Sequence, residues 1–167
     1  PTSGPSISLH FSQDGSKLVT GYGHDTIVEV CSFNTQTGVV HPLFRGWDVH
    51  RGVKYYPGIM EFSKDSRFLY IHASCVTSPP IGYPAKLVLQ YDARATDSMQ
   101  FAQSRIIIDS TALLSECVTQ LGPDGKLYFG ENGVDSVGCF NNPEILGPGC
   151  GFQLNAVSLD GHGSWGS

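Results

Sequence analysis

The sequence predicts an all-β chain, and two of its features carry that prediction. Apolar and polar residues alternate in short runs, and turn formers are frequent, with 20 Gly and 10 Pro in 167 residues. Such alternation is typical of strands that bury one face. The surface helix formers Ala, Glu and Lys are scarce by comparison, which argues against a helix bundle or a coiled coil.

A repeated unit organises the predicted strands. Three segments align on the turn aspartates Asp14, Asp65 and Asp124, which lie 51 and 59 residues apart. In the first copy, residues 7–11 read Ile-Ser-Leu-His-Phe, the alternation of a half-buried strand. The aspartate accepts hydrogen bonds from the backbone two residues on, and Gly15 or Gly125 adopts a positive φ at little cost. Each copy therefore begins as strand, tight turn, strand.

Two more strands complete each predicted unit. Third strands are expected at residues 27–33, 87–92 and 136–140, and fourth strands at residues 39–44, 104–109 and 155–159. Four-stranded units repeated at this interval are typical of β-propeller blades. We predict one partial propeller domain, residues 1–167, with blades at about 7–45, 58–110 and 116–160. Long loops are expected at residues 46–57 and 75–85. No helix is required, although residues 109–116 tolerate one.

Three blades do not close a ring, because closed propellers have about four to eight blades. The two outer blades would expose apolar faces and unpaired strand edges. We therefore expect partners that cover them. The remaining blades of a longer parent chain are one candidate, which the start at Pro1 favours. A second copy of this chain is the other.

The motifs of the repeat resemble a known family. The first copy carries Phe-Ser-x-Asp-Gly-Ser-x-Leu, and Leu121–Tyr128, Asn141–Pro143, Gly147, Cys150, Phe152 and Ala156–Leu159 follow in order near the end of the chain. This succession resembles the WD40-like or YVTN-like propeller region of Bacteroidota cell-surface proteins. Those proteins often carry PKD-type domains and a gliding-motility-associated C-terminal domain, the sorting signal of type IX secretion. Ser66 departs from the pattern, because it replaces the turn glycine of the second copy.

The resemblance implies an extracellular or cell-surface module of a much longer, adhesin-like protein. We expect a scaffold or recognition role, with a protein or glycan as ligand, and no enzymatic activity. One alternative is a propeller hydrolase or lyase that acts on a polysaccharide or a lactone. Another is a structural subunit of an extracellular assembly whose open edges add strands to neighbours.

Binding residues are expected on the two long loops. Exposed aromatic residues on loops are common in recognition surfaces, and the candidates are Trp47, His50, Tyr55, Tyr56 and Tyr83. The alternative is that these rings pack between blades.

Charge and motifs exclude several other classes. The net charge of −5 and the scattered bases give no electrostatic support for nucleic-acid binding. No apolar run approaches the roughly 18 residues of a membrane-spanning helix. The turn aspartates lack the further ligands of a calcium loop, and the histidines lie near no nucleophile motif. We therefore expect no metal, no cofactor and no catalytic residues.

The five cysteines leave at least one thiol unpaired within the chain. Cys139 and Cys150 flank a ten-residue loop, and a disulfide between them is possible if the chain is exported. The alternative is that the cysteines are small buried side chains.

Overall fold

The computed structural model of the chain confirms the all-β prediction. Three antiparallel sheets follow one another along the sequence, and each is built from consecutive strands. The structure describes residues 7–22, 26–47, 49–50, 52–75, 84–110, 117–131 and 134–161. The predicted loop at residues 75–85 and the tolerated helix at residues 109–116 lie largely outside this described part.

Blade 1 is a four-stranded sheet in sequence order. Its strands are β1 (Ile7–Phe11), β2 (Lys17–Tyr22), β3 (Ile27–Phe33) and β4 (Val40–Trp47). All four were predicted. The fourth extends further than the predicted strand at residues 39–44, because residues as far as Trp47 pair with β3.

Blade 2 has five strands and a short helix. In chain order its elements are β5 (Val49–His50), β6 (Val53–Phe62), β7 (Phe68–Cys75), β8 (Lys86–Asp92), α1 (Ser98–Gln103) and β9 (Ile106–Asp109). The predicted loop at residues 46–57 is wrong, because β5 and the first half of β6 occupy it. A register shift between Pro57 and Met60 lets β6 accommodate Pro57 at an irregularity of the ladder. The helix α1 was not predicted.

Blade 3 again has four strands. They are β10 (Cys117–Leu121), β11 (Leu127–Glu131), β12 (Ser136–Phe140) and β13 (Phe152–Ser158). A 3-10 helix, η2 (Gly147–Cys150), precedes the last strand. The fourth strand thus begins three residues before the predicted one at 155–159.

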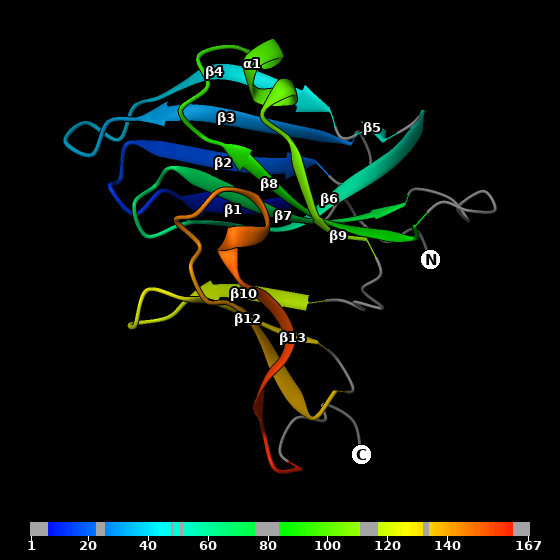
Figure 1. Cartoon of the computed structure of the whole chain (residues 1–167). Coiled ribbons are helices and arrows are strands. Elements are labelled where there is room, and N and C mark those ends of the chain that lie inside the picture. The colour runs from blue at the N-terminus through cyan, green and yellow to red at the C-terminus, as the bar shows by residue number, and fades with distance from the viewer. Residues whose placement is uncertain are drawn as a thin grey trace, which may run out of the picture.

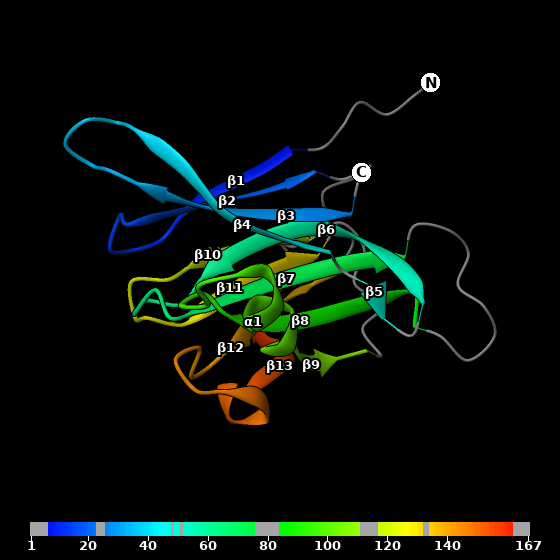
Figure 2. The ribbon, with the colours of Figure 1, turned by 90° about the horizontal axis from the view of Figure 1, so that it is seen from above.

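The hydrophobic core lies between the blades. Figure 1 shows blade 2 between blades 1 and 3, and Figure 2 shows the three blades from above. Both β1 and β10 pack against β6. Strand β7 shows why, since it is buried on both faces. Leu69 and Ile71 belong to the cluster shared with blade 1, whereas Phe68 and Tyr70 belong to the cluster shared with blade 3. The alternation of side chains along one strand therefore serves two interfaces.

A buried polar network fastens blade 3 to blade 2. The amide of Gln90 donates to the Tyr70 hydroxyl (2.6 Å) and to the Ile145 carbonyl (2.9 Å), and it accepts the Gly147 N–H (2.7 Å). The Tyr70 hydroxyl donates to the Pro143 carbonyl (2.9 Å). All the partners in blade 3 lie between β12 and β13, so this connection is anchored by satisfied hydrogen bonds.

Candidate functional site

The repeated turns have the structure that the aspartates predict. Asp14 accepts hydrogen bonds from the Ser12 hydroxyl (2.6 Å) and the Ser16 N–H (2.9 Å). Partial burial of the carboxyl group acts to raise its pKa. The hydrogen bonds together outweigh this effect and lower the pKa of Asp14 to about 2. Gly15 has a φ of 68°, as this turn requires. The aspartate is thus a structural residue.

The other two turns repeat this arrangement. Asp65 accepts from the Ser63 hydroxyl (2.6 Å) and the Arg67 N–H (3.1 Å), and Asp124 accepts from the Lys126 N–H (3.2 Å). Gly125 has a φ of 85°. The five predicted turn residues thus lie in the turns of the structure; they are Asp14, Gly15, Asp65, Asp124 and Gly125.

Two of the predicted binding residues do not lie on a loop. Tyr55 and Tyr56 lie on β6 rather than on a loop. Tyr55 is completely buried in the core between blades 1 and 2, and its hydroxyl donates to the Pro84 carbonyl (2.8 Å). Its position matches the packing alternative, because a buried ring cannot meet a ligand at the surface.

Tyr56 is half-buried and pairs with Ser74 in the ladder. The backbones of Trp47 and His50 belong to β4 and β5, and their side chains lie outside the described part of the structure. Tyr83 also lies outside it. A binding role for these residues stays a prediction.

Cys139 and Cys150 are both free thiols and both buried. The possible disulfide is therefore not formed in this structure, and the two side chains fill space in blade 3 instead. Burial raises the pKa of each thiol, which favours the unreactive protonated form.

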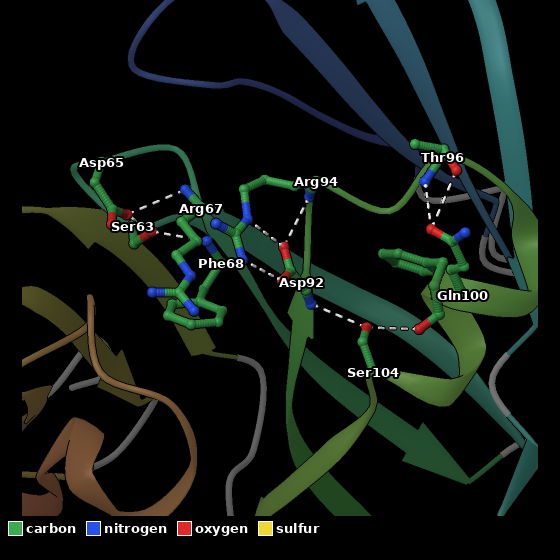
Figure 3. Close-up of polar contacts among 10 residues, drawn as sticks. Ser63, Asp65, Arg67, Phe68, Asp92, Arg94, Thr96, Gln100 and Ser104 are labelled. Carbon is green, nitrogen blue, oxygen red and sulfur yellow. Dashed lines mark hydrogen bonds and ion pairs between the residues drawn. The ribbon is translucent and has the colours of Figure 1, made fainter.

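An open pocket of about 410 Å³ lies where β8 ends and α1 follows. Its lining residues are Asp92, Arg94, Ala95, Gln100 and Ser104. Figure 3 shows the polar contacts that hold this region together. The pocket is the candidate site that the structure adds to the sequence analysis.

A bidentate ion pair forms one wall of the pocket. The Nε and Nη2 atoms of Arg94 donate to Oδ1 (3.0 Å) and Oδ2 (2.8 Å) of Asp92. These hydrogen bonds lower the pKa of the Asp92 carboxyl below its usual value. The Arg94 side chain is nevertheless 57 % exposed. Its guanidinium is thus fixed in orientation and accessible to a ligand.

The helix forms the opposite wall. Asp97 caps α1 by accepting the Gln100 N–H (2.8 Å). The side-chain carbonyl of Gln100 accepts from both the N–H (3.2 Å) and the hydroxyl (3.1 Å) of Thr96. Ser104 Oγ accepts the Asp92 N–H (3.0 Å) and donates to the Phe101 carbonyl (2.7 Å). These bonds join α1 to the end of β8. We call this joined region the rim, and the pocket that it lines the rim pocket.

Arg67 stands beside this rim. Its guanidinium carbon lies 4.7 Å from the centroid of the Phe68 ring, a cation–π contact. Its Nε is buried and has no hydrogen-bond partner among the described residues. A buried donor without a partner costs about 1–3 kcal/mol, so a ligand atom that accepts from it would recover stability. The positive charge of Arg67 also helps to lower the pKa of Asp92.

The sequence carried one signal for this site. Asp97 followed three residues later by Gln100 resembles the capping pattern that begins helices, and it marks the start of α1. The rest could not be foreseen, because a six-residue helix is too short to show a hydrophobic period.

Two features are absent from the described residues. Nowhere among them do three His, Cys, Asp or Glu side chains gather closely enough to hold a metal ion. In the same part of the chain, no helix has the length and apolar character that a membrane crossing requires.

No protein-family model and no curated protein matches the sequence. The structure does resemble solved β-propellers. A candidate 6-phosphogluconolactonase from Bacteroides fragilis aligns with a TM-score of 0.59 and 14% identity, over 95% of this chain and 41% of its own. The periplasmic gluconolactonase of Pseudomonas aeruginosa aligns with a TM-score of 0.54 and 19% identity, over 95% and 42%. A protein from Lactobacillus plantarum aligns with a TM-score of 0.52 and 14% identity, over 78% and 36%.

These similarities establish the fold. The chain is a partial β-propeller of about three blades, and it spans about two fifths of the length of the propellers it matches. Identities this low carry no statement about activity.

Proposed function

We propose that the chain is a recognition and scaffold module of a larger β-propeller protein that acts outside the cell. The share of the matched propellers that it spans supports the larger protein. The placement at the cell surface, with adhesion and type IX secretion, rests on the resemblance of its motifs to Bacteroidota surface proteins. In this proposal the blades provide rigid support and the ligand binds at their rim.

The pocket between β8 and α1 is the observation that carries the binding proposal. It presents a fixed guanidinium, a carboxylate, a side-chain amide and a hydroxyl within one open hollow. Donors and acceptors mixed in this way suit a ligand rich in hydroxyl groups, and glycans are such ligands. A second ligand class, an acidic segment of a protein, would use mainly the arginines.

A glycan array followed by NMR titration tests this function. We expect a glycan to shift the amide signals of residues 92–104, and Arg94→Ala together with Gln100→Ala to weaken its binding at least tenfold. Lys17→Ala is the matched control, because it removes one positive charge from blade 1 and should leave the affinity unchanged. Binding that survives the double substitution would place the ligand elsewhere.

Lactone hydrolysis is a second candidate function. Two proteins that align with 95% of this chain are named as lactonases, which supports testing lactones as substrates. A chain that releases acid from gluconolactone faster than the buffer does would support this candidate.

A further inference from the structure

A second group of polar side chains lies where β1 of blade 1 packs against β6 of blade 2. Ser8 and His10 are on β1, and Glu61 is on β6 of the next blade. Ser8 and His10 are two positions apart on one strand, so their side chains point to the same face of the sheet. His10 and Glu61 each lie four residues before the turn aspartate of their copy, and the packing of β1 against β6 brings the two positions together.

The three side chains form an ordered chain of contacts. Ser8 Oγ lies 3.0 Å from Nε2 of His10. On the other side of the ring, Nδ1 lies 3.7 Å from Oε2 of Glu61. This second distance is longer than a hydrogen bond, and contacts within catalytic groups are often long before a ligand binds. Each ring nitrogen therefore has one partner, a hydroxyl on one side and a carboxylate on the other.

The carboxylate is held in place by the backbone. Oε1 of Glu61 accepts the Phe62 N–H (2.9 Å), which leaves Oε2 directed toward His10. The Glu61 side chain is 11 % exposed and that of His10 is 26 % exposed. In the tautomer that carries its proton on Nδ1, the ring presents this N–H to the Glu61 carboxyl group and Nε2 accepts the hydroxyl proton of Ser8.

We propose that Ser8, His10 and Glu61 are a nucleophile, a general base and a positioning carboxylate that hydrolyse esters or lactones. Such a group is recognised by geometry and roles, and it recurs on unrelated folds in different chain orders. A nucleophile within hydrogen-bond reach of a base that a third group orients is the arrangement that activates a serine. The inference departs from the expectation that the chain is not an enzyme. It is also independent of the ligand proposed for the rim pocket.

The reaction balances with water as the second reactant. Ser8 Oγ bonds to the carbonyl carbon of the substrate, and its proton moves to Nε2 of His10. The bond to the leaving oxygen then breaks, and that oxygen takes the proton from His10 as an alcohol. A water molecule attacks the acyl group on Ser8 with His10 again accepting a proton. The acid departs as Ser8 Oγ recovers its hydrogen. Glu61 forms and breaks no bond in these steps and orients the ring.

Covalent labelling tests the nucleophile without a natural substrate. The full chain is treated with a fluorophosphonate, and the modified peptide is located by mass spectrometry. We expect the label on Ser8, and its loss in Ser8→Ala. Ser32→Ala is the matched control and should label as the parent does. This serine of blade 1 is partly exposed, and its hydroxyl donates to the His41 carbonyl (3.4 Å).

Kinetics separate the roles of the other two residues. With p-nitrophenyl acetate and gluconolactone, His10→Ala should lower kcat/KM about 100-fold, in the range of a lost general base. Glu61→Gln should lower kcat with little change in KM, and Glu61→Asp should restore part of it, which a merely structural role would not do. Circular dichroism confirms that each variant is folded. A folded parent that neither takes the label on Ser8 nor hydrolyses either compound overturns the proposal. Intact labelling in His10→Ala would also overturn it.

Discussion

His72 is unusual in the interior because its side chain is both titratable and buried. It lies on β7, 6 % exposed, with its ring 5.4 Å from that of Phe129 in blade 3. Neither ring nitrogen has a hydrogen-bond partner among the described residues. Burial lowers the pKa of His72 from 6.5 to about 4, because the charged form would lose its hydration between two blades.

Acid should therefore destabilise the folded chain through this residue. The folded state binds fewer protons than the unfolded state between the two pKa values, so the contribution is complete above about pH 6.5 and declines as pH falls toward 4. Between pH 7 and pH 5 we expect a loss of about 2 kcal/mol in the free energy of unfolding. Urea unfolding at both pH values measures it.

His72→Phe should abolish most of that loss, since an apolar ring of similar size binds no proton. His41→Phe, at an exposed position, is the control and should keep the pH dependence of the parent. An equal loss in His72→Phe and the parent would show that other groups cause the acid sensitivity.

At the scale of elements, α1 clamps blade 2 to blade 1. Its Phe101 stacks on Tyr91, with ring centroids 4.4 Å apart, and lies 5.1 Å from Phe44 of β4. The Ser98 hydroxyl also accepts the Arg45 N–H (3.3 Å). The ring of Phe101 passes so close to Gly46 that an added Cβ would lie 2.7 Å from it. The glycine is therefore required by the helix packed over it.

Gly46→Ala should loosen this clamp. Because the new methyl group overlaps the Phe101 ring, we expect the free energy of unfolding to fall by about 1–3 kcal/mol, as for other overpacked sites. Gly130→Ala is the matched control, since nothing lies within 4 Å of an added Cβ there. Chemical denaturation of both variants checks the difference. Equal stabilities would contradict the account of α1.

Sequence reasoning recovered the elements that have a period or a turn motif. The first strand of the repeat alternates apolar and polar residues, and the turns carry aspartate, so both could be predicted. The start of β6 could not, because Pro57 and Gly58 are typical of a loop and here lie at an irregularity within a strand. The rim pocket was missed for a related reason. Asp92 comes from β8 and Gln100 from α1, and only the unpredicted helix brings them together.

The contacts between different blades could not be predicted from the sequence either. Ser66, which replaces the turn glycine of the second copy, adopts a positive φ of 60°. Its hydroxyl also accepts the Asp14 N–H of blade 1 (3.0 Å). The contact between His10 and Glu61 likewise crosses from one blade to the next. Spacing within one repeat does not reveal such contacts, because they depend on how the repeats stack.

At the scale of the whole molecule, the outer blades have unpartnered apolar faces. Leu9 and Phe11 of β1 are 54 % and 46 % exposed, whereas Met60 and Phe62, the equivalent residues of β6, are completely buried against blade 1. Blade 3 exposes Val118, Leu154 and Val157. Covering a Leu or Phe side chain contributes about 1.5–3 kcal/mol. The repeat itself thus indicates that another blade belongs on the face of Leu9 and Phe11.

Light scattering of the purified chain across a concentration series tests most directly whether these are open blades of a larger ring. We predict association of the parent chain through its uncovered faces, and a folded monomer once Leu9→Lys and Phe11→Lys are combined. A parent chain that stays a stable, well-folded monomer at every concentration would contradict the account.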